Sequence, residues 1–150
     1  MYQRKFLWAG LFALLSLFIS AELFAQADTI EKRQKLMKSN AAATKAIKGA
    51  AEQKDHATIE TKAKDIMGNM DQVLDLFPKG STAGKTKAKA EIWDKWDEFS
   101  KNPGKVKKAA SELADAAKGK DDAAVEAKVK ALGGACKNCH EPFRAEKYSE

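Results

Sequence analysis

The chain has 150 residues, a formal net charge of +6 and a charged-residue content of 32%. This length predicts a single domain. Lysines and acidic residues are interspersed along the whole chain, which indicates solvated helix faces and argues against a nucleic-acid-binding protein.

The N-terminal residues 1–27 are predicted to form a secretory signal peptide. Two basic residues precede an apolar run at 6–19, and Ala25-Gln26-Ala27 is a small-x-small cleavage pattern. A retained membrane anchor is the alternative, but the apolar run is shorter than a membrane-spanning helix needs. We therefore expect export, cleavage after Ala27 or else after Ala25, and no membrane contact by the mature domain at 28–150.

The first helix of the mature domain is predicted to cover residues 28–52. Helix-forming residues fill this stretch, and no glycine or proline interrupts it before Gly49. A narrow stripe at three- to four-residue spacing would face the core. The stripe consists of Ile30, Arg33, Met37, Asn40, Thr44 and Ile47.

The second helix is predicted to begin after Asp55, whose side chain can cap it, and to stop at Pro78. Apolar residues recur along it at helical spacing. Met67 and Met70 lie among these residues, which is typical of methionines that fill a core. Glycine, serine and threonine at 80–84 then indicate a loop.

The third long helix is preceded by a cluster of two tryptophans and a phenylalanine at 93–99. Because Pro103 cannot lie deep inside a helix, we expect a short turn within this cluster, whose rings pack in the core or against the edge of a cofactor. The main helix then begins at Phe99 or Asn102 and ends at Ala117.

The fourth helix is predicted to begin at an aspartate cap, Asp121 or Asp122, and to place its apolar residues and the segment 136–140 on one face. Gly133 and Gly134 indicate a close approach of the backbone to a cofactor or to the first helix, or else a kink. No run of residues alternates like a strand. The predicted fold class is therefore all-α, an antiparallel four-helix bundle with a cofactor between facing helices.

The pattern Cys136-Lys137-Asn138-Cys139-His140 predicts one covalently attached haem c. Each thiol adds to a vinyl group, and the histidine takes one axial position on the iron. The spacing places Cys136, Cys139 and His140 on one helical face. A redox dithiol would need a βαβ setting, and a zinc knuckle would need four ligands where His56 is the only further histidine. A structural disulfide or a chance occurrence of this spacing would also account for the pattern.

The composition supports a cofactor in the core. Leu, Ile, Val and Phe account for 17 of the 123 residues from Asp28 onward, which is low for a chain that must fold by burying its own side chains. A haem would supply the missing apolar volume, so we expect the apo-chain to be poorly folded. Because a c-type haem is attached outside the cytoplasm, the haem pattern and the signal peptide together predict a periplasmic protein.

Four further motifs recur in this order in one known family. They are Lys32 to Asn40 in the first helix, Leu76-Phe77-Pro78 after the second, Ile92-Trp93 with Phe99, and Phe143-Arg144 after the haem pattern. Together they resemble the cytochrome c-prime family, and within it the low-spin branch called cytochrome c-556. The resemblance implies a periplasmic four-helix bundle with one haem near its C-terminal helix, often a homodimer through the first two helices. Asn102-Pro103-Gly104 departs from the family, in which related chains continue as helix.

Four side chains are candidates for the second axial position on the iron: Met37, His56, Met67 and Met70. His56 lies beside a predicted helix cap, where a surface role is expected, and the two methionines of the second helix fit the core. The resemblance implies Met37. In the family, the residue at this place stands over the distal side of the haem, and it is a methionine in the low-spin branch but another apolar residue in high-spin members.

Two arginines flank the predicted ligands. Arg33 lies four residues before Met37, and Arg144 lies four residues after His140. Each can bring a planar guanidinium near a haem propionate or the proximal ligand. A surface ion pair or a solvated charge is the alternative for both, although the family usually has a basic residue at the place of Arg144.

The main functional prediction is a periplasmic one-electron carrier with His140 and Met37 as axial ligands and with redox proteins as partners. The alternative is a five-coordinate haem protein that binds nitric oxide or carbon monoxide, and coordination by Met37 decides between the two. An enzyme such as a peroxidase is not expected, because the sequence places no acid–base group on the distal side.

Overall fold

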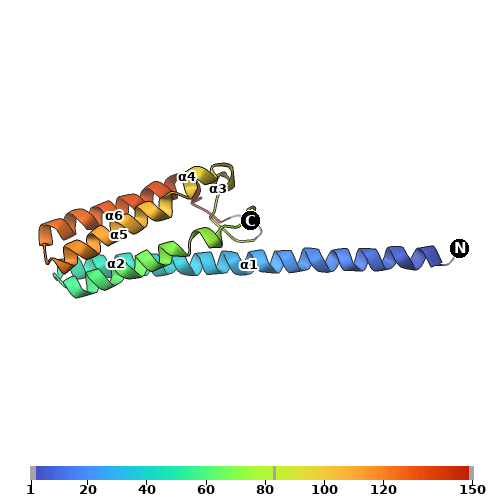
Figure 1. The fold of residues 1–150 in the computed structure, drawn as a ribbon, viewed down its shortest axis with the longest axis horizontal. Helices are drawn as coiled ribbons and strands as arrows, with labels where there is room; N and C mark the ends of the chain where they lie inside the picture. The colour runs from blue at the N-terminus through green and yellow to red at the C-terminus, as the bar shows by residue number, and fades with distance from the viewer. Residues whose placement is uncertain (1–2, 83, 149–150) are drawn as a thin grey trace.

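Four long helices form an antiparallel bundle in the computed structural model, which describes residues 3–82 and 84–148, with side chains from Gln26 onward (Figure 1). The second helix packs against the first and third, and the third packs against the fourth, whereas the first and fourth are in contact over a much smaller area. The helices are α1 (Gln3–Glu52), α2 (His56–Asp71), α5 (Asn102–Lys118) and α6 (Asp122–Phe143). The predicted all-α four-helix bundle is confirmed.

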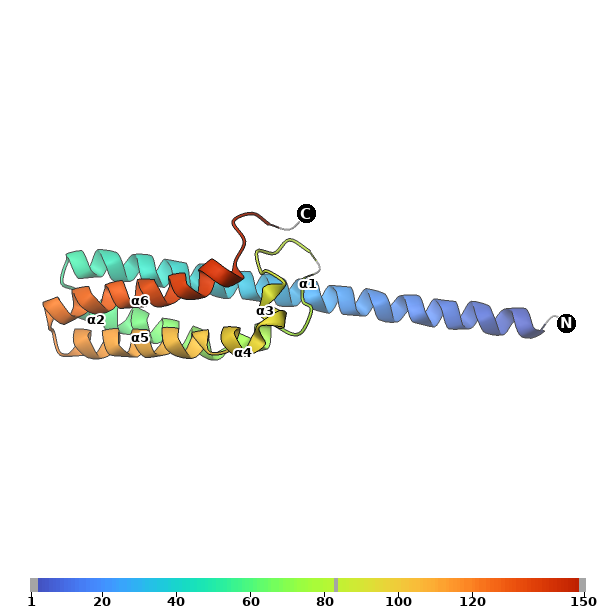
Figure 2. The ribbon, with the colours of Figure 1, turned by 90° about the horizontal axis from the view of Figure 1, so that it is seen from above.

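Helix α1 extends far beyond the bundle toward the N-terminus (Figures 1 and 2). It passes without a break through the predicted cleavage site at Ala27, so the signal peptide stays a prediction. Within the bundle, the buried side of α1 carries Ile30, Leu36, Ala43 and Ile47. Arg33 is buried as well, so three residues of the predicted stripe, Ile30, Arg33 and Ile47, are buried.

The predicted caps at the start of two helices are confirmed. Asp55 accepts a hydrogen bond from the Thr58 backbone N–H at 3.1 Å, and Asp121 accepts one from the Ala124 N–H at 2.9 Å. Each cap satisfies a backbone donor that the first turn of a helix leaves without a partner. As predicted, Gly119 ends α5.

The segments between α2 and α5 differ from the prediction in detail. Helix α2 ends at Asp71 rather than near Pro78, because the next backbone N–H groups bond three residues back and form the 3-10 helix η1 (Leu74–Leu76). The aromatic cluster forms two single turns, α3 (Glu91–Asp94) and α4 (Trp96–Phe99), rather than one. Pro103 lies in the first turn of α5. The backbone N–H groups of a first turn form no hydrogen bond within the helix, so a proline, which lacks this group, is tolerated there.

The core is built from few large side chains and many alanines. Ala63 of α2 and Ala110 of α5 are fully buried, which lets these two helices approach closely. A fully buried leucine or isoleucine contributes about 1.5–3 kcal/mol, so a short list of such residues gives a modest hydrophobic core. The large side chains that are almost completely buried are Ile47, Ile59, Ile66, Ile92, Leu113 and Leu132.

Candidate functional site

Cys136, Cys139 and His140 share one side of the C-terminal part of α6, as their spacing predicts, and line a cavity in the bundle. The cavity has a volume of about 470 Å³ and lies between all four long helices. This volume is within the range of sites that bind a small molecule or cofactor, about 300–1,000 Å³. Two free thiols and an imidazole at the edge of an apolar cavity therefore fit a covalently attached haem.

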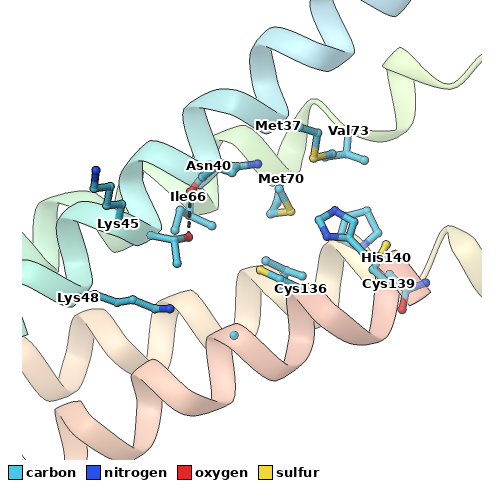
Figure 3. A pocket seen from close by; sticks show the side chains of 16 residues that line it. Met37, Asn40, Lys45, Lys48, Ile66, Met70, Val73, Cys136, Cys139 and His140 are labelled. Atoms are coloured by element: carbon cyan, nitrogen blue, oxygen red, sulfur yellow. Dashed lines mark hydrogen bonds between the residues drawn. The ribbon is translucent and has the colours of Figure 1, made fainter. Parts of the chain in front are cut away.

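The opposite wall of the cavity is formed by α1 and α2. Figure 3 shows Met37, Met70 and His140 directed into the same space from α1, α2 and α6. Among the residues that the structure describes, no carboxylate lines this cavity. The lining residues outside α6 are Met37, Asn40, Ala41, Thr44, Lys45 and Lys48 from α1, Ile66, Met70 and Val73 from α2 and its C-terminal end, and Asn102, Pro103 and Val106 from α5.

Both thiols are half-buried and free of any disulfide. Burial raises the pKa of the Cys136 thiol, and it raises the pKa of Cys139 to about 11, with a smaller contribution from the neighbouring Cys136. In this environment both thiols are therefore protonated at neutral pH. This does not describe a reactive redox dithiol, in which at least one pKa is lowered.

His140 is held as a neutral imidazole. The protein around the ring desolvates it enough to lower its pKa, although the residue as a whole is solvent-accessible, and the positive charge of Arg144 lowers the pKa further. The neutral ring is the form that binds a metal. Among the described residues, no group of three or more His, Cys, Asp and Glu side chains is arranged to hold a metal ion by itself.

The four candidates for the second axial position lie in different places. Met37 lines the cavity, as predicted. Met70 also lines it and is buried in the core, so its assignment to the core alone was incomplete. Met67 packs against the core outside the cavity, and His56 lies near the far end of the bundle, where it pairs with Asp122. The spacing of apolar residues along α2 could not show which of Met67 and Met70 lines the cavity, because both lie on the inner side of the helix.

Arg33 and Arg144 lie in contrasting environments. Arg33 is buried and points to the segment 76–86, and it does not line the cavity. Its predicted contact with a propionate stays a prediction. Arg144 is exposed, directly follows α6 and is close enough to His140 to lower its pKa.

Sequence analysis missed several residues of the cavity wall. Lys45 and Lys48 continue the spacing of Met37 and Thr44 along α1, which is the signal that could have found them. Gly133 lines the cavity, and a side chain there would meet no other protein atom within 4 Å. Of the predicted alternatives for Gly133 and Gly134, a close approach to α1 is therefore wrong, and a close approach to a cofactor stays a prediction.

A second cavity, of about 460 Å³, lies along the same side of the bundle, near the turns that join α1 to α2 and α5 to α6. Lys48 lines both cavities. In the second one, Asp122 pairs with Lys54 at 2.6 Å and with His56 at 2.9 Å. The hydrogen bond from Lys54 is the main cause that lowers the pKa of Asp122, and His56 adds to it.

No helix within the described part of the chain is long and apolar enough to cross a membrane.

The comparison with known proteins covers nearly the whole of the bundle. The sequence model of the family described as Cytochrome C' matches residues 28–144. The chain is 48% identical to cytochrome c' of Rhodospirillum rubrum over 86 residues, which cover 56% of this chain and 58% of that relative. It is 31% identical to cytochrome c-556 of Agrobacterium tumefaciens over 124 residues, which cover 81% of this chain and all of the relative.

The fold is also similar to that of a solved structure. Cytochrome c prime from Shewanella frigidimarina superposes with a TM-score of 0.74 at 27% identity, over 81% of this chain and 97% of that chain. The matched region contains the bundle and the Cys136–His140 segment. The chain therefore belongs to the cytochrome c' family and carries one covalently bound haem c.

Proposed function

We propose that this haem protein binds a small diatomic gas, nitric oxide or carbon monoxide, in the cavity between the four long helices. The haem supplies the iron that such gases bind. Cys136 and Cys139 would hold the haem through thioether bonds, and the His140 imidazole would bind its iron. The gas would bind the iron on the side opposite His140, next to the wall formed by α1 and α2.

The observation that carries this proposal is the apolar part of the wall opposite His140. Met37, Ile66 and Val73 offer no charge and no strong hydrogen-bond donor, which suits a small, nearly apolar ligand. None of these three side chains can act as the acid–base group that peroxide chemistry needs. The proposed protein is therefore a binding protein rather than an enzyme.

Related proteins suggest which ligands to test. One solved structure with this fold is a nitric oxide complex of a variant of cytochrome c prime from Alcaligenes xylosoxidans. At 22% identity that likeness concerns the fold alone, so it contributes only the choice of gas.

A second candidate function, one-electron transfer between periplasmic redox proteins, is favoured by Met37. Its side chain enters the same cavity as His140 from the opposite helix. A thioether on the iron would fill the second axial position, favour the ferrous form and leave no site for a gas.

A carbon monoxide titration of the reduced holoprotein, followed by absorption spectroscopy, separates the two functions. Gas binding predicts a high-spin ferrous spectrum that converts fully and rapidly to the carbon monoxide form. A low-spin spectrum in both oxidation states, with a slow and weak response to carbon monoxide, would contradict gas binding and support electron transfer with Met37 as ligand.

We also propose that the protein is exported to the periplasm and that residues 1–27 are removed. The apolar run at 6–19 and the small residues before Asp28 support this. N-terminal sequencing of the holoprotein from a periplasmic extract should begin at Asp28, or at Gln26 if cleavage follows Ala25. A chain that still carries residues 6–19 would contradict export by a cleaved signal.

We further propose a homodimer through α1 and α2. A solved cytochrome c' of this fold, 27% identical to the chain, is described as having ligand-controlled dimer dissociation. Ala42 is exposed on α1, and Ala123 is exposed on α6. In sedimentation velocity, Ala42→Glu should shift the holoprotein toward monomer, whereas Ala123→Glu should not. A wild type that sediments as a monomer at all concentrations would contradict the dimer.

A further inference from the structure

Arg33 is the most extensively bonded buried charge in the described part of the molecule. It is only 4% exposed, and its guanidinium donates to the Thr86 hydroxyl at 2.8 Å and to the Ser81 carbonyl at 3.2 Å. It also donates to the Ser81 hydroxyl at 3.3 Å and, at 3.5 Å, to the Leu76 carbonyl. Arg33 thus ties α1 to the segment that follows η1.

All of these acceptors are neutral oxygens. Burial lowers the pKa of Arg33 to about 10, so the side chain stays charged at neutral pH. A buried charge whose partners are neutral is costly, and its geometry must be good to be tolerated. The planar fork of arginine, which reaches several acceptors at fixed angles, is what such a site needs. This points to a positional role rather than a solvated surface charge.

One set of contacts leads from Arg33 to the end of α6 through the backbone. Thr86, whose hydroxyl accepts from Arg33, also accepts from the Ala88 N–H at 3.1 Å. The segment 86–89 then pairs with the chain beyond α6. The Lys89 N–H donates to the Phe143 carbonyl at 3.1 Å, and the Ala145 N–H donates to the Lys87 carbonyl at 2.8 Å.

A second set of contacts reaches the same place through aromatic rings. The Arg33 guanidinium carbon lies 4.4 Å from the centroid of the Phe77 ring. Phe77 packs on Phe99 with centroids 4.8 Å apart, and Phe99 meets Phe143 edge to face at 5.3 Å. Both sets of contacts therefore end at Phe143, which lies three residues after His140 and so on the same side of α6.

We propose that Arg33 is a positioning residue that fixes the end of α6, and with it His140, relative to the turn of α1 that carries Met37. Arg33 lies one turn before Met37, and Phe143 lies one turn after His140, so one clamp holds the turns that face each other across the cavity. The clamp acts whether the second axial position is open or held by Met37. It also differs from a propionate contact, because it works through Thr86 and the aromatic rings.

The test compares Arg33→Gln, Arg33→Lys, Thr86→Val and the double variant Arg33→Gln/Thr86→Val. Gln34→Ala is the matched control, because Gln34 ties the same loop to α1 through an exposed hydrogen bond of 2.7 Å to the Lys85 carbonyl. Each holoprotein is characterised by its carbon monoxide dissociation constant in the ferrous state and by its thermal unfolding midpoint. Thr86→Val is the mildest change and keeps the test valid if the Arg33 variants fold poorly.

We expect Arg33→Gln and Thr86→Val each to change the carbon monoxide dissociation constant, by about fivefold, as is typical of residues coupled in one network. The double variant should change it no more than Arg33→Gln alone, and the unfolding midpoints should show the same coupling. Arg33→Lys should resemble Arg33→Gln, because it keeps the charge but loses the fork. Gln34→Ala should resemble the wild type in ligand affinity.

Two outcomes would overturn the proposal. If both variants lower only the unfolding midpoint and leave the dissociation constant unchanged, the clamp is purely structural. If Thr86→Val is silent while Arg33→Gln changes the dissociation constant and Arg33→Lys restores it, Arg33 acts through its charge, as a propionate contact would.

Discussion

The two cavities along the α1–α6 side have almost the same volume, about 470 and 460 Å³, yet they differ in chemistry. The first is walled largely by methionine and aliphatic side chains, with two thiols and an imidazole at one edge, and its charged lining residues are two lysines, Lys45 and Lys48, with no carboxylate among the described residues. The second has charged residues, including Asp122, Lys54 and Glu126, around a smaller apolar floor. Size alone therefore does not identify the haem site, whereas the type and pairing of the lining side chains do.

The largest effect is expected when both thiols of the first cavity are removed, because the first cavity then loses the groups that distinguish it from the second. Cys136→Ser/Cys139→Ser is expected to yield protein without covalent haem and with much lower helicity, because the thin core needs the cofactor. Acidified-ketone extraction and far-ultraviolet circular dichroism measure the two effects. The matched control, Ala51→Ser in the second cavity, should keep its haem. A double serine variant that unfolds as cooperatively as the wild type would contradict the prediction.

A substitution on the opposite wall should have the next largest effect. Met37→Ala is expected to tighten carbon monoxide binding about tenfold, or roughly 1.4 kcal/mol, because it clears the wall that faces His140. Met70→Leu, at the same wall, should change it by far less, since the volume is conserved. Carbon monoxide titration measures both. If Met70→Leu changed carbon monoxide binding more than Met37→Ala, Met70 rather than Met37 would be the residue that faces the iron on the side opposite His140.

Arg144→Gln tests the exposed charge at the rim of the first cavity. Removing a positive charge near the iron should lower the reduction potential by tens of millivolts at low ionic strength, because the ferric form carries the additional charge. Salt should reduce the difference between variant and wild type, since Arg144 is exposed. Potentiometry at two salt concentrations measures it, with Lys147→Gln as control. A potential that equals the wild-type value at low salt would make Arg144 a solvated charge.

The smallest effect is expected in the second cavity. The lowered pKa of Asp122, caused first by Lys54, means that its ionised form stabilises the fold above the pKa of the unfolded chain, and that this contribution is lost as the pH falls through the folded value. Asp122→Asn should therefore lower the unfolding midpoint slightly at neutral pH and not at strongly acidic pH. The haem spectrum should not change. Asp115→Asn, at an exposed position on α5, serves as control for the loss of one negative charge. A pH-independent difference between Asp122→Asn and the wild type would show that the ion pairs are not its cause.

The helices could be predicted from the sequence because local signals fix their ends. Asp55 and Asp121 have side chains that cap a backbone N–H, Pro103 tolerates only a first turn, and Gly119 ends α5. The end of α2 could not be predicted from the sequence. Pro78 is the first residue that must end the helix, but the helix gives way to a 3-10 turn before it, where Leu76 packs against the core.

The haem-binding side of the site could likewise be predicted, because three of its residues are adjacent on one helix. The rest depends on contacts between distant segments. Met70 and Met67 look equivalent in the sequence, and only the packing of α2 separates them. Arg33 shares its stripe with Met37, yet its side chain turns to Ser81 and Thr86, about fifty residues away, a pairing that no local pattern contains.

The half-burial of the two thiols affects whether haem attachment or folding of the bundle comes first. A thiol with a raised pKa, such as Cys139, is a poor nucleophile at neutral pH, and the walls around it restrict access to a flat macrocycle. In the unfolded chain both thiols return to ordinary pKa values and are open to solvent. We therefore expect the thiols to react with haem faster in the unfolded chain than in the closed bundle.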